Sequence, residues 1–285
     1  MNKSPFNYIG NKFQVIQQLQ DLFPENIDTL VDFFCGGCDV ITNTPANKKI
    51  AIDVNSYVMD ILKEFQHYSL DEILAFINMR IEEFDLSKTN EQGYLNYRDA
   101  YNNDDKYHTP LDLYVLSRFS FHFTMRFNKD LKMNAGFGRG FSNFSTRQQQ
   151  SIKQFHKDIQ NVILLNQDFK TFDISNLTNN DLCYFDPPYL IANNVYNNGN
   201  SEVNQKWTEH DEHQLLKYID NLNAHNIRFA LSNVTHHRDI KNEILIDWIE
   251  KNQFNVHEIK TSYYHCTHTV HKYENATIEV LVTNY

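Results

Sequence analysis

The chain has 285 residues, of which 41% are hydrophobic and 14% aromatic, enough to bury a sizeable core and to exclude wholesale disorder. Its formal net charge of −10 argues against a protein that binds nucleic acid over its whole surface. No apolar run approaches the roughly 20 residues that span a membrane, and residues 1–12 lack the apolar core of a signal peptide. The four cysteines are too few for a disulfide scaffold. We therefore expect a soluble, cytoplasmic protein.

Charge is distributed unevenly along the chain. Residues 57–105 carry 4 basic and 11 acidic side chains, whereas residues 115–160 carry 8 basic and 2 acidic ones. A basic segment inside an acidic protein is typical of local contact with phosphate groups, but a solvated helix face gives the same pattern. Charge alone leaves both interpretations open.

Apolar periodicity predicts strands and helices that alternate at both ends of the chain. The predicted strands are 29–34, 50–53, 162–165, 182–186 and 228–233, and the predicted helices are 12–23, 55–66, 209–225 and 239–252. Residues 256–264 and 277–283 alternate as an antiparallel hairpin. This order predicts an α/β fold with a mainly parallel sheet and an antiparallel edge. Residues 57–157 contain helical patterns and no convincing parallel strand, which predicts a helical insertion.

The segment Asp186-Pro187-Pro188-Tyr189 follows the apolar run at 182–185. Two prolines fix the backbone and remove two N–H donors, which leaves carbonyl oxygens beside a carboxylate and an aromatic ring. Asp186 and the Pro187 carbonyl can accept the two hydrogens of a planar amine while Tyr189 stacks on its ring. The alternative is a proline-rich turn that only ends a strand.

A glycine pair, Gly36-Gly37, follows the first predicted strand. Glycine lets the backbone pass close to a ligand. Asp53 follows Asp32 by 21 residues, near the ~20-residue offset at which an acidic residue binds ribose hydroxyls in nucleoside sites. The two features together favour a nucleoside site.

Two groups of residues resemble metal ligands. Cys35 and Cys38 have the spacing of redox or zinc sites, but no second pair accompanies them. The other group is His265, Cys266, His268 and His271. It falls in the predicted hairpin, where alternate positions face opposite sides, so not all of its members can converge. We expect no metal site and an exposed hairpin rich in histidine.

In this order, the motifs resemble those of the Dam-type DNA adenine-N6 methyltransferases, the alpha group of amino-methyltransferases with a DPPY tetrapeptide. The resemblance includes residues 8–12, 32–40, Asp53 and 186–189. Residues 126–139 are similar to the family's pattern of RYN, a variable hairpin and FNVPxGR, and residues 280–285 are similar to its last strand. The match runs nearly from end to end.

The resemblance implies a Rossmann-like S-adenosylmethionine-dependent methyltransferase sheet with an antiparallel edge hairpin, plus a mainly helical inserted DNA-recognition domain. It places a catalytic domain at residues 1–56 and 158–285 and a target-recognition domain at 57–157. The implied residues that bind S-adenosylmethionine are Tyr8, Lys12, Asp32, Phe33, Gly36, Gly37, Asp53, Asp168, Phe169 and Asp186. The implied catalytic residues are Asp186, Pro187, Pro188 and Tyr189. The family commonly has Gly where this chain has Cys38, a departure that bears on cofactor affinity.

The implied reaction is direct transfer of a methyl group to the N6 amine of an adenine that has left the stack of double-stranded DNA. It needs no metal. The implied DNA-binding residues are Phe121, His122, Arg126, Asn128, Lys129, Lys132, Asn134 and Arg139. Helix core is the alternative for the aromatic residues. The polar segment 193–205 is expected to act as a clamp on DNA.

Other interpretations stay open at this point. One is methylation of cytosine N4 or of another amine, against which Asp186 argues because those relatives typically have Ser or Asn there. Another is a DNA-binding relative with a degenerate cofactor site. Cytosine C5 methylation needs a nucleophilic thiol, and no cysteine here follows a proline as in families of that kind. A restriction-modification, phage or housekeeping role, a cognate restriction endonuclease and the recognised sequence are left open, GATC being a guess from the family.

Overall fold

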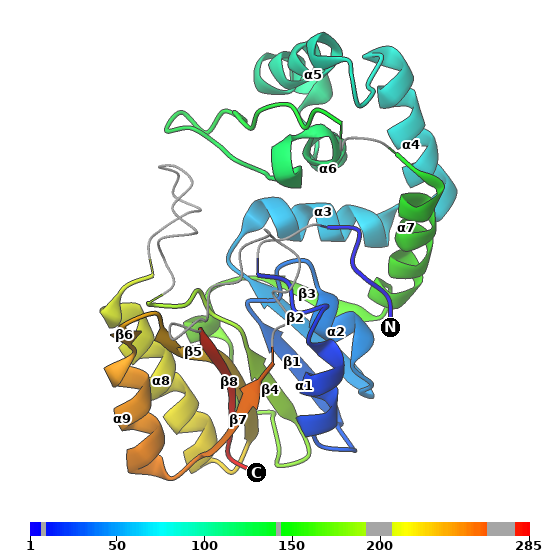
Figure 1. The fold of residues 1–285 in the computed structure, drawn as a ribbon. Helices are drawn as coiled ribbons and strands as arrows, with labels where there is room; N and C mark the ends of the chain where they lie inside the picture. The colour runs from blue at the N-terminus through cyan, green and yellow to red at the C-terminus, as the bar shows by residue number, and fades with distance from the viewer. Residues whose placement is uncertain (7–9, 141–143, 192–206, 261–276) are drawn as a thin grey trace.

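The computed structural model describes residues 1–6, 10–140, 144–191, 207–260 and 277–285. Within them, an eight-stranded sheet has the order β3-β2-β1-β4-β5-β8-β7, and β6 pairs with β5 outside this path (Figure 1). The strands are β1 Thr29–Phe33, β2 Lys48–Asp53, β3 Val162–Asn166, β4 Leu182–Phe185, β5 Arg228–His237, β6 Ile240–Lys241, β7 Asn255–Ile259 and β8 Ile278–Thr283.

The strands from β3 to β5 pair in parallel, whereas β8 is antiparallel to both β5 and β7. This confirms the predicted parallel sheet with an antiparallel edge. Strand β4 is buried at all four positions, and β1 at four of its five. Such strands read as nearly continuous apolar runs because helices cover both faces of a parallel sheet.

Most helices within the described residues begin at polar residues that satisfy their first N–H groups, whereas Ile16–Leu22 and Asp39–Asn43 have no such side-chain cap. Asn55 accepts a hydrogen bond from the Val58 N–H, and Ser69, Ser145 and Thr208 each form a reciprocal capping box. The helices are α1 Ile16–Leu22, α2 Asp39–Asn43, α3 Ser56–His67, α4 Leu70–Glu83, α5 Glu91–Asn103, α6 Pro110–Phe119, α7 Thr146–Ile159, α8 Glu209–Ala224 and α9 Glu243–Asn252. Short 3₁₀ turns occur at Asp105–Tyr107, Phe121–Phe123 and Phe169–Thr171.

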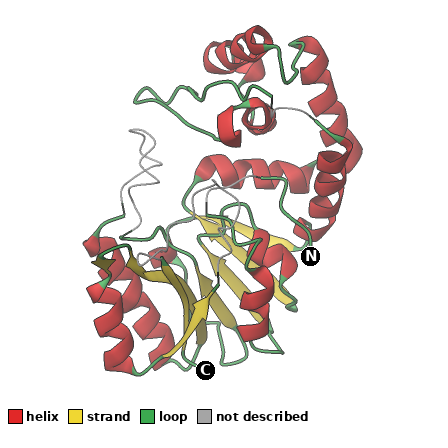
Figure 2. Ribbon diagram, viewed as in Figure 1, coloured by secondary structure: helices red, strands yellow, loops and turns green. Residues whose placement is uncertain are grey.

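Helices lie on both faces of the sheet (Figure 2). On one face, Leu215 and Ile219 of α8 and Leu245 of α9 pack in one buried apolar cluster with Val31 of β1. The other face carries α1 and α2, whose apolar side chains share a second cluster with Leu30 of β1. This arrangement leaves the carboxyl ends of the parallel strands facing the helical part of the chain (Figure 1).

Helices α4 to α7 and the segment 120–140 form the predominantly helical part between β2 and β3, as predicted. Its buried side chains, among them Leu116 of α6 and Ile152 of α7, belong to the same apolar cluster as Leu62 of α3 and Ala51 of β2. The division into two domains therefore stays a prediction. Within the described part of the chain, no helix is long and apolar enough to cross a membrane.

Predicted boundaries differ from the structure by one or two residues at several elements and by more at those described next. The helix predicted over 239–252 begins at Glu243, because Ile240–Lys241 pairs with β5 as a short strand. The helix predicted over 12–23 is shorter, Ile16–Leu22, and β5 continues beyond residue 233 to His237. Residues 193–205, predicted to be a polar loop, and residues 261–264 of the predicted hairpin lie outside the described residues.

Candidate active site

Three carboxylates gather at the carboxyl ends of adjacent parallel strands. Asp32 lies in β1, Asp53 ends β2 and Asp186 directly follows β4, and β1 is paired with both other strands. Burial raises the pKa of all three, and the charge of Asp186 raises that of Asp32 further. Among the described residues, Asp32 Oδ2 has no hydrogen-bond partner. Buried carboxylates of this kind favour a cationic ligand.

The glycine pair forms a tight turn between β1 and α2. The Gly36 N–H donates to Asp53 Oδ2 at 2.9 Å, and the Cys38 N–H donates to the Cys35 carbonyl at 2.7 Å. Gly36 has φ 46° and Cys38 has φ 64°, in the left-handed region that glycine adopts most easily. Position 38, where the family that the sequence resembles commonly has Gly, therefore needs a positive φ. Cys38 adopts this φ, and its side chain is buried.

Lys12 lies against the carboxylate of the proline tetrapeptide. Its Nζ is 2.6 Å from Asp186 Oδ1 and 2.7 Å from Oδ2, and it also contacts the Gly10 carbonyl at 3.2 Å. The Tyr189 hydroxyl lies 3.2 Å from Asp186 Oδ1. The side chains of Lys12 and Asp186 are 8% and 17% exposed, so this ion pair is largely shielded from water. The structure thus brings Lys12, Asp186 and Tyr189, all three among the predicted site residues, into one cluster.

Glu279 is a member of this cluster that the sequence did not single out. It lies on β8, and its Oε1 accepts a hydrogen bond from the Tyr189 hydroxyl at 2.8 Å. The same oxygen is 3.7 Å from Lys12 Nζ. A single glutamate in a terminal strand carries no local signal, so only the placement of β8 beside β5 reveals it.

Aromatic side chains form a wall beside the glycine turn. Phe169 lies 5.4 Å from Phe34 between ring centroids, and Trp207 lies 5.7 Å from Phe34. Phe34 has φ 63°, which turns the chain out of β1 toward the glycine pair. Asp168 begins the short 3₁₀ turn at Phe169–Thr171 and accepts its Lys170 N–H. Phe169 is one of the predicted cofactor-binding residues, whereas Phe34 and Trp207, which pack beside it, were not singled out from the sequence.

The side chain of Phe33 lies in the core instead. It is fully buried and stacks on Phe185 of β4, with ring centroids 4.5 Å apart. Neighbouring residues in a strand point to opposite faces, so Phe33 faces α8 while Asp32 faces the other side. Any contact of Phe33 with a ligand would therefore come from its backbone.

The segment 120–140 contains the predicted hairpin. Phe127 and Met133 pair in an antiparallel bridge, and the Asn128 side chain closes the turn by accepting the N–H groups of Asp130 and Lys132. Arg126 donates to the side chain and the carbonyl of Asn134 at 2.9 and 2.8 Å. Arg126, Asn128 and Asn134 therefore have contacts that hold the hairpin together.

The other predicted DNA-binding residues differ in their surroundings. Lys132 donates to Asn103 at 2.8 Å, and Arg139 pairs with Glu91 at 2.7 Å in an exposed ion pair. Lys129 is exposed and has no ion pair or side-chain hydrogen bond within the described part of the chain.

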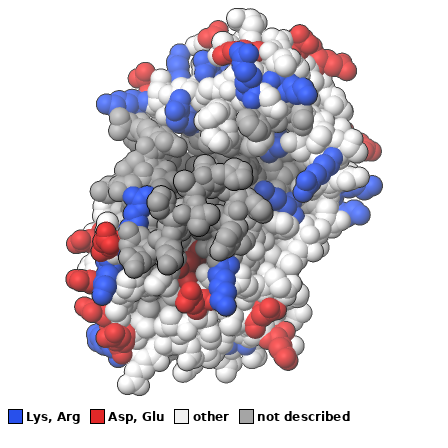
Figure 3. Space-filling view, viewed as in Figure 1, with Lys and Arg blue, Asp and Glu red and all other residues white. Residues whose placement is uncertain are grey.

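Phe121 is 52% exposed, so the helix-core alternative does not hold for it. The adjacent His122 is exposed too, and its ring contacts that of Phe121. In Figure 3, Lys and Arg side chains gather on the front of the helical upper part.

Some predicted residues cannot be placed. Tyr8 lies outside the described residues, as do His265, Cys266, His268 and His271. Among the residues that are described, no three His, Cys, Asp or Glu side chains are grouped as metal ligands.

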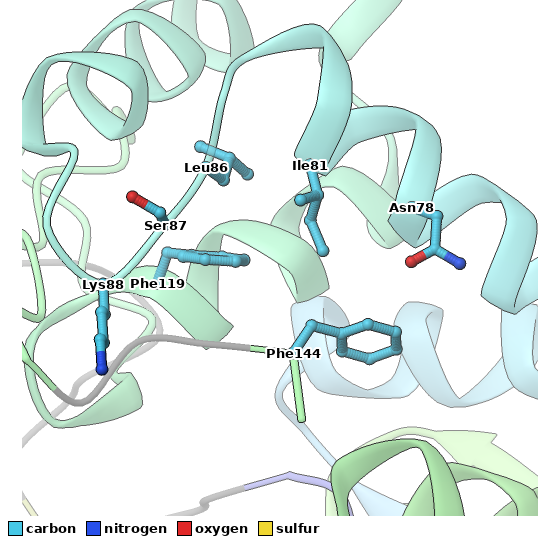
Figure 4. A pocket seen from close by; sticks show the side chains of 7 residues that line it. All are labelled: Asn78, Ile81, Leu86, Ser87, Lys88, Phe119 and Phe144. Carbon is cyan, nitrogen blue, oxygen red and sulfur yellow. The ribbon is translucent and has the colours of Figure 1, made fainter. Parts of the chain in front are cut away.

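The helical part contains a pocket, whose lining side chains are seen in Figure 4. It is formed by α4, the segment after it, the end of α6 and Phe144. Its lining residues are Asn78, Ile81, Leu86, Ser87, Lys88, Phe119 and Phe144. None of the predicted catalytic or cofactor-binding residues is among them.

Comparison with known proteins gives relatives over the whole chain. This chain is 42% identical over 285 residues to the type II methyltransferase M.FokI of Planomicrobium okeanokoites. The matched region makes up 99% of this chain and 43% of that protein. The modification methylase StsI of Streptococcus sanguinis is 41% identical with the same two coverages. The modification methylase LlaI of Lactococcus lactis subsp. lactis is 31% identical, over 100% of this chain and 44% of that protein. The chain thus spans less than half the length of these curated relatives.

The model of the D12 class N6 adenine-specific DNA methyltransferases matches residues 8–264. This match covers the glycine turn, the strand-end carboxylates and the proline tetrapeptide in one continuous stretch. Since it extends over most of the sequence and includes the residues that the sheet brings together, the chain belongs to the D12 class N6 adenine-specific DNA methyltransferase family.

Proposed function

We propose that this protein transfers a methyl group from S-adenosylmethionine to the exocyclic N6 amine of an adenine in duplex DNA. Membership of the family supports the class of reaction. The observation that carries the proposal is the position of Asp186 and Tyr189, which follow β4 next to the glycine turn after β1. A carboxylate and an aromatic ring at this place can hold a planar amine beside a nucleoside-containing cofactor.

The tetrapeptide at residues 186–189 would make the weakly nucleophilic amine of adenine more reactive. The lone pair of adenine N6 is delocalised into the ring, and hydrogen bonds from its two hydrogens to Asp186 and the Pro187 carbonyl favour a pyramidal nitrogen. Tyr189 would stack on the base and fix its orientation. Burial raises the pKa of Asp186, which makes its carboxylate a better acceptor for the proton that the amine loses.

The glycine turn and its carboxylates fit S-adenosylmethionine. Asp53 would accept hydrogen bonds from the ribose hydroxyls, and the unpartnered Oδ2 of Asp32 suits an ammonium group. Phe34 and Phe169 offer apolar surface for a purine ring. When bound, S-adenosylmethionine supplies a methyl group on a positively charged sulfur, and the carbon–sulfur bond breaks as the nitrogen–carbon bond forms. The excess of buried carboxylates over ammonium groups favours this cationic donor.

The helical part would recognise the DNA. The target base leaves the duplex at a cost of a few kcal/mol, and exposed groups such as Phe121 and Lys129 are available to contact DNA. We therefore assign target recognition to residues 57–157 and catalysis to residues 1–56 and 158–285.

A restriction-modification setting is the one we propose, because relatives carry the names type II methyltransferase and modification methylase. In that setting a cognate restriction endonuclease would cut the same sequence when it is unmethylated. The chain spans less than half the length of those relatives, so this setting is a proposal separate from the reaction itself.

The reaction is tested by incubating the protein with labelled S-adenosylmethionine and unmethylated genomic DNA, followed by nucleoside analysis. We expect N6-methyladenine from the wild type and none from Asp186→Ala, and sequencing of the modified sites gives the recognised sequence. Asp173→Ala, at an exposed carboxylate outside the site, is the control and should keep activity. N4-methylcytosine as the product would overturn the choice of base, and DNA binding without any methyl transfer would indicate a catalytically degenerate relative.

A further inference from the structure

Glu279 and Asp186 contact the same two side chains, Tyr189 and Lys12, although Glu279 lies on β8 and Asp186 follows β4. The Tyr189 hydroxyl is 2.8 Å from Glu279 Oε1 and 3.2 Å from Asp186 Oδ1. Lys12 Nζ is within 2.7 Å of both Asp186 oxygens and 3.7 Å from Glu279 Oε1. Strand β5 separates β8 from β4 in the sheet, so this meeting is a product of the topology.

These contacts compete with one another. A tyrosine hydroxyl has one hydrogen, and the shorter contact directs it to Glu279 rather than to Asp186. An ammonium has three hydrogens, so Lys12 can bond both carboxylates after a small shift of its flexible side chain. Glu279 therefore offers both donors an acceptor other than Asp186.

Asp186 can accept the hydrogens of an amine only if Lys12 and the Tyr189 hydroxyl give up part of their contact with it. Both of its oxygens contact Lys12 here, and one of them also faces the Tyr189 hydroxyl. An incoming amine hydrogen has to share or displace these donors. We propose that Glu279 is a positioning residue, which holds Lys12 and the Tyr189 hydroxyl while Asp186 accepts the target amine; this inference rests on the proposed function.

The hydrogen bond from Tyr189 does not by itself explain why residue 279 is charged. A neutral glutamine could accept the Tyr189 hydrogen equally well, whereas a carboxylate with a side chain 10% exposed carries a desolvation cost. The charge acts on Lys12, which is the cation of the cluster.

Asp32 and Tyr184 are the other titratable groups facing Asp186. Removal of the Glu279 charge also lowers the pKa of Asp186, because a nearby like charge raises it.

The test compares Glu279→Gln with Glu258→Gln, a matched change at an exposed position on neighbouring β7. Methylation of adenine N6 is measured with saturating DNA and S-adenosylmethionine over about pH 5 to 9. The affinity for S-adenosylmethionine and thermal unfolding are measured on the same preparations.

In Glu279→Gln we expect kcat to fall at least about tenfold, while the Kd for S-adenosylmethionine changes less than about threefold. We also expect the acid limb of the kcat profile to move to lower pH, because Lys12 then stabilises the Asp186 carboxylate alone. Glu258→Gln should match the wild type in all three measurements.

Two results for Glu279→Gln would overturn the inference. One is a wild-type kcat with an unmoved acid limb. The other is a lower kcat together with a lower melting temperature, while the acid limb of the pH profile stays in place. If Glu279→Gln does not fold, Glu279→Asp decides, since it keeps the charge but shortens its reach. Reduced kcat in that variant supports the inference, and wild-type kcat contradicts it. Failure of the proposed function is distinct, because then the wild type itself forms no N6-methyladenine.

Discussion

Asp53 at the end of β2 accepts the backbone N–H of Gly36 at 2.9 Å, in the turn that follows β1. Its other oxygen accepts the Asn55 N–H at 2.8 Å, at the start of α3. One carboxylate therefore fixes the glycine turn, the end of a strand and the beginning of a helix relative to one another. A binding site built on such a carboxylate is already ordered before its ligand arrives, which reduces the entropy lost on binding.

Asp53→Ala should weaken binding of S-adenosylmethionine at least tenfold, or about 1.4 kcal/mol. The change removes the acceptor for the ribose and leaves the Gly36 and Asn55 N–H groups without their partner. Titration calorimetry measures the affinity, and Asp60→Ala, at a half-exposed carboxylate on α3, is the control. Equal affinities of wild type and Asp53→Ala would show that this carboxylate does not bind the cofactor.

Asp39 should make stability depend on pH. Burial raises its pKa from 3.8 to about 6, against the hydrogen bond from the Ser4 N–H at 2.8 Å, which lowers it. The raised value means that the folded state favours the protonated acid. Its stabilising contribution is therefore complete below about pH 3.8 and is lost as the pH rises through about 6.

Asp39→Asn removes this titration, so its free energy of unfolding relative to wild type should improve between about pH 4 and 7, by up to about 3 kcal/mol. Urea unfolding of both proteins across this range measures the difference. Asp71→Asn, at an exposed carboxylate in the first turn of α4, should show no such trend. A constant difference between Asp39→Asn and wild type across the range would exclude the raised pKa.

The sheet could be predicted because its strands are short apolar runs of the kind that parallel pairing requires. The same periodicity could not reveal what long-range pairing brings together. Glu279 reaches Tyr189 only because β8 lies beside β5, and Trp207 reaches Phe34 from a distant part of the chain. Local sequence contains no information on either contact.

Two other features could be recognised only from the structure. The chain has Cys38 where the family commonly has Gly, and the positive φ of 64° explains why Gly is common there. The family resemblance implies that Arg126 contacts DNA, and the structure shows in addition that it is bonded to Asn134 within the hairpin. Composition indicates that a segment is basic, whereas the structure distinguishes cations with internal partners from the others.

Asn102 of α5 should control DNA affinity through the hairpin. Its side chain accepts the Met133 N–H at 2.8 Å and donates to the Met133 carbonyl at 2.9 Å. Asn102→Ala leaves both buried backbone groups without these partners, so we expect the free energy of unfolding to fall by about 1–3 kcal/mol. DNA affinity should fall as well, while affinity for S-adenosylmethionine is unchanged. Asn96→Ala on the exposed side of α5 is the control. Unchanged DNA affinity in Asn102→Ala would separate the hairpin from DNA binding.

Lys129 at the turn of the hairpin should contribute a phosphate contact. It is exposed, and it has no ion pair or side-chain hydrogen bond within the described residues. A lysine that neutralises one phosphate contributes about 0.9 to the slope of log Kd against log salt concentration. Lys129→Ala should therefore lower this slope by about 0.9 and leave thermal unfolding unchanged. Fluorescence anisotropy with a labelled duplex at several salt concentrations measures the slope. Lys63→Ala on α3, where the lysine pairs with Asp60, should keep the wild-type slope. Equal slopes for Lys129→Ala and the wild type would mean that the turn of the hairpin does not touch the DNA backbone.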